Sequence, residues 1–212
     1  METSFRSDGA HLTEKKRGRG RPRAFDVDAV LDRAVEVFWK NGYEGADLGE
    51  LTQTMGINRP SLYAAYGDKR ALFFKAVERY YQNVARLPLP VVADGARLEP
   101  AFFVRAILNC FYGHKPARGC LIACVLADQA NAHEDAKAIL KDLLLREQRR
   151  IEAWASSFPS CESAASKGQC FASLLIATLH SVAIKASAGI SRQQVQRDLE
   201  ATMPVLTGLL NA

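Results

Sequence analysis

Apolar residues recur at steps of three and four along most of the chain after residue 25, and no stretch alternates convincingly between apolar and polar residues as a strand would. This spacing places the apolar side chains on one face of a helix. Because 48% of the 212 residues are apolar, these faces can bury a substantial core. The sequence therefore predicts an all-α fold of about nine helices.

Composition divides the chain into three parts. Residues 1–24 hold few apolar side chains and a cluster of lysines and arginines, so we expect a disordered basic arm. Residues 87–95, LPLPVVADG, carry two prolines and a glycine, which is typical of a linker. We therefore expect two folded parts after the arm, residues 25–86 and residues 87–212.

Charge and hydropathy indicate the cellular location and whether the chain crosses a membrane. The net charge is +5, and the positive charge is concentrated in the arm. No apolar run approaches the ~20 residues that a membrane span needs, and the first 25 residues lack the apolar core of a signal peptide. We expect a cytoplasmic protein with no membrane partner.

The residues with chemical reactivity form no catalytic or metal-binding pattern. The five cysteines include no C-x-x-C pair, which favours reduced thiols over a disulfide framework or a zinc site. Paired catalytic carboxylates, a G-x-S-x-G elbow, a phosphate-binding glycine loop and an H-E-x-x-H helix are all missing from the sequence. We expect no enzyme, no cofactor and no metal.

A compact unit, DLGELTQTMGINRPSLYAAY, occupies residues 47–66. Asp47 can cap a short helix, with Glu50 as its partner in a capping box, and Gly56 can end it. Asn58 can cap the next helix. Two short helices joined by a tight turn, after a longer amphipathic helix, are typical of the helix-turn-helix that places its second helix in a DNA major groove.

From Gly20 to about Tyr80 the chain resembles the TetR family of bacterial transcriptional regulators. The run G-I-x-x-x-S-L-Y followed by D-K-x-x-L-F carries the resemblance, and it is formed by Gly56, Ile57, Ser61, Leu62, Tyr63, Lys69, Leu72 and Phe73. Family members join a three-helix DNA-binding head through a fourth helix to a helical body that dimerises and usually binds a small effector. The resemblance implies a homodimeric regulator that leaves a palindromic operator when an effector binds. Most members of the family are repressors, so the resemblance also implies a repressor.

The DNA-contact positions follow from side-chain chemistry and from the resemblance; they are Arg19, Arg21, Arg23, Asn58, Arg59, Pro60, Ser61, Tyr63 and Lys69. Arg59 can bind guanine O6 and N7 as a fork or clamp a phosphate. The arm contains Arg-Gly-Arg-Pro, which resembles the AT-hook core that inserts arginines into a narrow minor groove. The alternative is a solvated tail that adds only counterion release.

The second part offers weaker indications. Candidate ligand contacts are Phe103, Phe111, Cys120, Cys124, Trp154 and His180. Because Cys120 and Cys124 lie four apart on a predicted helix, we expect them on one face, either as core residues or as a redox or electrophile sensor. The apolar stripes of residues 171–186 and 195–210 predict a four-helix dimer interface; its residues are Leu175, Leu179, Val182, Leu199, Met203 and Leu206.

Two other classes remain open at this point. An architectural protein of AT-rich DNA could use the arm, but it would not need the ~120 residues after the linker, which are apolar enough to form a body. An enzyme is the other, and the missing catalytic motifs argue against it.

Overall fold

The computed structural model describes residues 27–85, 98–158 and 165–211, and in these ranges the chain forms nine α-helices, one π-helical segment and no strand. The predicted all-α fold is confirmed. The basic arm, with Arg19, Arg21 and Arg23, and the predicted linker lie outside the described residues. In chain order the helices are α1 (Val27–Gly45), α2 (Leu48–Met55), α3 (Arg59–Tyr66), α4 (Lys69–Ala85), α5 (Pro100–Tyr112), π-helical η1 (Leu121–Leu126), α6 (Ala127–Ala132), α7 (Glu134–Ala155), α9 (Ala165–Ser187) and α10 (Arg192–Asn211).

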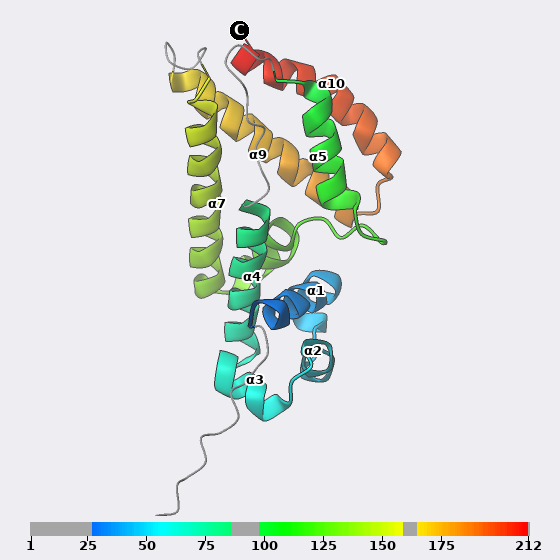
Figure 1. Ribbon diagram of the computed structural model, residues 1–212, viewed down its shortest axis with the longest axis vertical. Coiled ribbons are helices and arrows are strands. Elements are labelled where there is room, and N and C mark those ends of the chain that lie inside the picture. The colour runs from blue at the N-terminus through cyan, green and yellow to red at the C-terminus, as the bar shows by residue number, and fades with distance from the viewer. Residues whose placement is uncertain (1–26, 86–97, 159–164, 212) are drawn as a thin grey trace, which may run out of the picture.

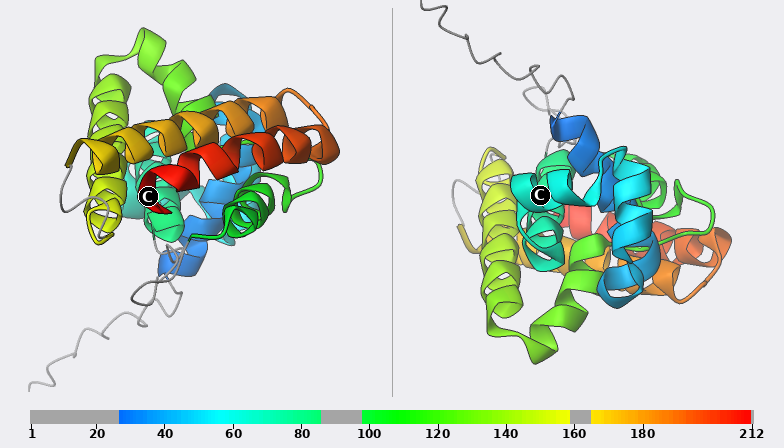
Figure 2. Two further views of the ribbon diagram at one scale, coloured as in Figure 1. Left: turned by 90° about the horizontal axis from the view of Figure 1, so that it is seen from above. Right: turned by 90° about the horizontal axis from the view of Figure 1, so that it is seen from below.

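Helices α1, α2 and α3 form a head at one end of the molecule, and α4 runs from this head into the larger body (Figure 1). Helix α4 packs mainly on α1 and also touches α7 and η1. In the body, α9 packs on α7, and α10 packs on both α5 and α9. Helices α9 and α10 lie side by side at the end opposite the head, as the view from above in Figure 2 shows.

Buried apolar side chains form two clusters, and the first of them crosses the boundary that composition indicates between residues 25–86 and residues 87–212. The first contains residues of α1, α2, α3, α4 and η1, and it also includes Ala136 and Leu143 of α7. The second joins α5, α9 and α10 with Ile151 and Ala155 of α7. Helix α7 therefore contributes to both cores.

The helix boundaries around the head follow the local sequence closely. Regular helical geometry in α1 breaks at Gly42, which has a φ of 73°, as the glycine there predicts. Asp47 caps α2 by accepting hydrogen bonds from the backbone N–H of Gly49 at 2.6 Å and of Glu50 at 3.0 Å. The predicted capping box is wrong, however, because the Glu50 carboxylate accepts a hydrogen bond from Asn41 Nδ2 at 2.6 Å instead.

One described helix, Ser166–Ser187 within α9, is long and apolar enough to cross a membrane by length and composition, with a mean hydropathy of 1.5. The apolar runs of the sequence did not predict a segment of this length and hydropathy. The helix packs against α5, α7, α10 and η1, and the core helix of a soluble protein passes the same test.

The residues expected at a dimer interface occupy a different place. Five of them are at most 3% exposed within this single chain; they are Leu175, Val182, Leu199, Met203 and Leu206. The sixth, Leu179, is half-buried in the wall of a cavity inside the body. Most of their surface is already covered within the single chain, so these side chains offer little area to a partner chain. The outward face of α9 and α10 instead carries Leu174, Ile184 and Val205, which are 46%, 58% and 74% exposed.

Candidate nucleic-acid interface

Helix α3 presents one anchored face and one free face. Leu62 is fully buried and Tyr66 is 5% exposed, so these two side chains fix the helix to the head. On the opposite side Arg59 and Pro60 are exposed, and Tyr63 keeps 49% of its surface accessible. The free face is therefore a protruding surface with one guanidinium and one phenol hydroxyl.

The start of α3 is held by Asn58, whose Oδ1 accepts a hydrogen bond from the backbone N–H of Ser61 at 2.8 Å. Pro60 lies in the first turn, where its missing N–H costs no hydrogen bond. Two of the predicted DNA contacts, Asn58 and Ser61, thus also shape the helix that presents the others. The six predicted contacts that the structure describes lie in three places: Asn58 caps α3, four lie within α3, and Lys69 begins α4.

Lys69 is held beside the head rather than left free in solvent. Its ammonium donates a hydrogen bond to the Glu44 carbonyl at 3.3 Å and lies 4.7 Å from the centre of the Tyr43 ring. Such a contact orients the amine while leaving its other protons available to an anion.

Two arginines that our sequence analysis passed over position this surface. Arg33 of α1 donates to the Met55 carbonyl at 3.3 Å, beside the turn at Gly56 that joins α2 to α3. Arg79 of α4 pairs with Asp28 at 2.8 Å and with Asp32 at 2.7 Å, which ties α4 to α1. Both contacts join residues far apart in the chain, so no local pattern could have indicated them.

The loop between α5 and η1 connects the body to the head. Trp39 of α1 donates its indole N–H to the Gly119 carbonyl at 3.2 Å. Arg118 in the same loop pairs with Glu36 at 2.6 Å. A further contact lies on the other side, where Arg70 at the start of α4 pairs with Asp135 at the start of α7 and lowers the pKa of that carboxyl to about 2. The orientation of α1 therefore depends on the body.

The body contains a partly open cavity of about 80 Å³ between α4, α5, η1, α7 and α9. It is lined by Tyr80, Tyr81, Val84, Cys110, Phe111, Cys120, Ile122, Leu143, Leu144, Glu147, Ile176, Leu179 and His180. Three of the predicted ligand contacts, Phe111, Cys120 and His180, lie in this wall.

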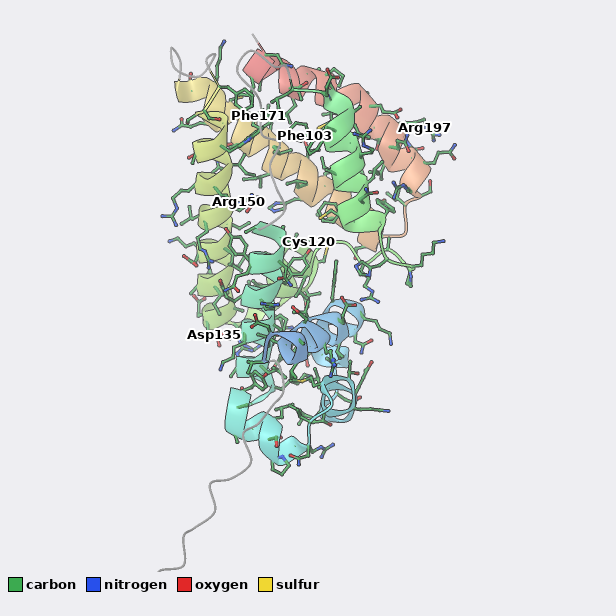
Figure 3. The ribbon with its side chains drawn as sticks, in the orientation of Figure 1. Phe103, Cys120, Asp135, Arg150, Phe171 and Arg197 are labelled. Atoms are coloured by element: carbon green, nitrogen blue, oxygen red, sulfur yellow. The ribbon has the colours of Figure 1, made fainter. Side chains whose placement is uncertain are left out.

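The other three predicted ligand contacts lie elsewhere. Phe103 and Trp154 pack with Phe171 in an aromatic cluster, where the Phe103 and Phe171 ring centres are 6.3 Å apart (Figure 3). Cys124 faces the Ala183 carbonyl, with its sulfur 3.9 Å from that oxygen. These side chains fill the core of the body and do not reach the cavity.

The two cysteines have different surroundings. Cys120 precedes η1 with extended backbone angles and lines the cavity, whereas Cys124 lies within η1 and faces the Ala183 carbonyl. Burial raises the pKa of the Cys120 thiol and of Cys110 in the same cavity wall. A raised pKa suppresses the thiolate, which is the form that reacts with oxidants and electrophiles.

Comparison with known proteins agrees with this geometry. A family model described as bacterial regulatory proteins, tetR family, matches residues 30–76, from α1 into α4. The repressor ComR of Escherichia coli (strain K12) is 36% identical over 110 residues, which are 50% of this chain and 52% of that protein. A solved cysteine mutant of the TetR family regulator CifR, complexed with 26-bp operator DNA, is 28% identical with a TM-score of 0.67, covering 87% of this chain and 98% of that one.

The family-model match assigns residues 30–76 of the chain to the TetR family. A second curated TetR-type relative, the repressor BdcR of Escherichia coli (strain K12), is 29% identical over 125 residues, or 58% of this chain and 62% of that protein. The chain thus spans about half to three fifths of the length of these two curated relatives. The structure of NemR, also from E. coli and in its reduced form, has a TM-score of 0.62 at 17% identity and 85% coverage of this chain (94% of NemR), which is a likeness of fold.

Proposed function

We propose that this TetR-family chain is a cytoplasmic homodimeric transcriptional repressor whose affinity for a palindromic operator changes when a small effector enters the body. The observation that carries the proposal is the free face of α3. Its Arg59 and Tyr63 project from a short helix that Asn58 caps and that Leu62 anchors. A helix held in this way can enter a major groove without losing its own packing.

The comparisons support the DNA-binding part of this proposal. CifR has been solved on operator DNA, and ComR and BdcR are both named repressors. All are transcriptional regulators rather than enzymes. We assign residues 25–86 to the DNA-binding part, residues 87–212 to effector binding and dimerisation, and residues 1–24 to a basic arm that adds phosphate or minor-groove contacts.

The dimer interface that we propose is the outward face of α9 and α10. A groove between these helices is lined by small and apolar side chains, among them Leu174, Ala177 and Ser181, and Lys185 pairs with Asp198 across it at 2.7 Å. Exposed apolar residues on two adjacent helices are the usual mark of an isologous contact. Two copies joined here would carry two α3 helices, as a palindromic operator requires.

Effector control is supported by the position of the cavity. Tyr80, Tyr81 and Val84 of α4 form one of its walls, and the same helix packs on α1 and α3 of the head. A ligand that fits one position of α4 better than another shifts the population between two arrangements of the head. The ligand needs no contact with DNA.

Replacing Arg59 with alanine tests the recognition face. If the guanidinium reads a guanine, operator binding weakens by about 1–3 kcal/mol and the preference at one base pair in each half-site relaxes. Fluorescence anisotropy on an operator selected from random duplexes, and on its single-base variants, measures both effects. Equal weakening on every sequence would instead make Arg59 a phosphate contact, and an unchanged affinity would remove α3 from the interface.

Deleting residues 1–23 tests the arm. We expect lower operator affinity and a shallower dependence of log K on log salt, because each lost phosphate contact removes about 0.9 from that slope. Binding isotherms at several salt concentrations give the slope. An arm that makes no DNA contact would leave both quantities as they are.

A further inference from the structure

The cavity wall combines carbon-rich surfaces with very few polar groups. Aliphatic and aromatic side chains from α4, α5, η1, α7 and α9 supply most of it, and none of the described residues in the wall is a lysine or an arginine. Among these described residues, Glu147 and His180 alone bring a carboxylate or an imidazole to the wall. An anionic ligand would therefore lose its hydration without gaining a cationic partner.

Glu147 is already paired within its own helix. Its two carboxylate oxygens accept hydrogen bonds from Arg150 at 2.8 Å and 3.0 Å, and its side chain is 18% exposed. The negative charge is thus neutralised at the edge of the cavity. A cationic ligand would have to displace Arg150 before it could use this carboxylate.

The wall also holds the side chains of Tyr80, Tyr81, Cys110 and Cys120, and Tyr80 interacts with Cys120 while Tyr81 interacts with Arg146. His180 is the group of the wall that can offer a ligand both a donor and an acceptor nitrogen. Burial lowers the pKa of its imidazole, so the ring is uncharged at neutral pH. Within the part of the chain that the structure describes, no hydrogen bond occupies either ring nitrogen. A neutral imidazole offers one donor and one acceptor, and both can serve a hydroxyl or a carbonyl group.

We propose that the cavity binds a small uncharged molecule with an apolar body and one hydroxyl or carbonyl group that hydrogen-bonds to His180. This assignment rests on the proposed function, because it names the effector class for the same site. The volume of about 80 Å³ is below the ~150 Å³ that holds benzene in an engineered apolar cavity. The enclosed space therefore holds only part of a single ring, and the rest of the ligand lies in the open mouth of the cavity.

Calorimetric titration of the full-length protein without DNA tests this class with four probes of similar size: phenol, toluene, benzoate and benzylammonium. We expect phenol to bind more tightly than toluene, because only phenol can use His180. Benzoate and benzylammonium should each bind at least about tenfold more weakly than phenol, because the cavity offers no free group of opposite charge to either ion. An ion within tenfold of phenol, or the absence of phenol binding, would overturn the proposal.

Three variants locate the site. In His180→Phe the advantage of phenol over toluene should disappear while toluene binding persists; a retained advantage would remove His180 from recognition. Leu179→Trp fills the cavity and should abolish the binding of both compounds. The control Leu145→Trp changes a half-exposed residue of α7 outside the cavity wall and should leave both affinities unchanged. Should Leu179→Trp fail to fold by circular dichroism, His180→Phe still decides.

These titrations are independent of DNA, so the two proposals can fail separately. Discrimination among the probes by a protein that binds no operator would contradict the proposed function alone. Operator binding by a protein that does not discriminate among the probes would contradict the effector class alone. If both proposals hold, phenol at saturating concentration lowers operator affinity in anisotropy, and it does so less in His180→Phe.

Discussion

Replacing Val205 with arginine should turn the protein into a monomer and lower operator affinity by about a hundredfold or more. Val205 is 74% exposed on the outward face of α10. In the dimer that we propose, the substitution places an unpaired charge at the interface twice, because the contact is isologous. Analytical ultracentrifugation at micromolar concentration measures the assembly, and anisotropy on the operator measures the binding.

Two controls give this result its meaning. Leu206 is the next residue but is 2% exposed and faces the body core, so Leu206→Arg should unfold the protein rather than dissociate it. Leu145 is a half-exposed residue of α7, and Leu145→Arg should change neither assembly nor DNA binding. A Val205→Arg protein that remains a dimer would place the interface elsewhere.

Leu62 and Tyr63 should show opposite effects although they are adjacent. Leu62→Ala removes a fully buried side chain that anchors α3, and we expect unfolding to become easier by about 2–5 kcal/mol. Tyr63→Ala removes a half-exposed side chain from the free face, and we expect unchanged stability but weaker operator binding.

Urea denaturation and anisotropy on the same two variants separate the roles. The melting of Leu62→Ala must also be checked at the temperature of the DNA assay, because a partly unfolded head would mimic the loss of a contact. Equal destabilisation by both substitutions would mean that Tyr63 is a packing residue and that α3 has no free recognition face.

The sequence predicted best where the cause is local. Asp47, Asn58 and Gly56 end or begin helices through hydrogen bonds and backbone angles that involve residues at most four apart. Side-chain type and spacing contain that information directly. The free and buried sides of α3 follow in the same way from the position of Leu62.

Prediction failed where distant parts of the chain decide the outcome. The apolar stripe of α10 showed that Leu206 is buried, but it could not show that α5 and α9, rather than a partner chain, cover it. Glu50 has a partner in α1 that the capping-box pattern does not consider. The surroundings of Cys120 and Cys124 likewise depend on contacts with distant helices that a spacing of four residues cannot express.

The shared core of head and body limits how this fold can be recombined. Leu121, Leu126 and Leu143 lie far along the chain, yet they complete the apolar cluster that also holds the head together. A chimera cut after α4 would transplant a head without these side chains and expose the surface that they cover. New operator specificities should therefore be grafted by exchanging the free face of α3, or by moving the head together with η1 and the first half of α7.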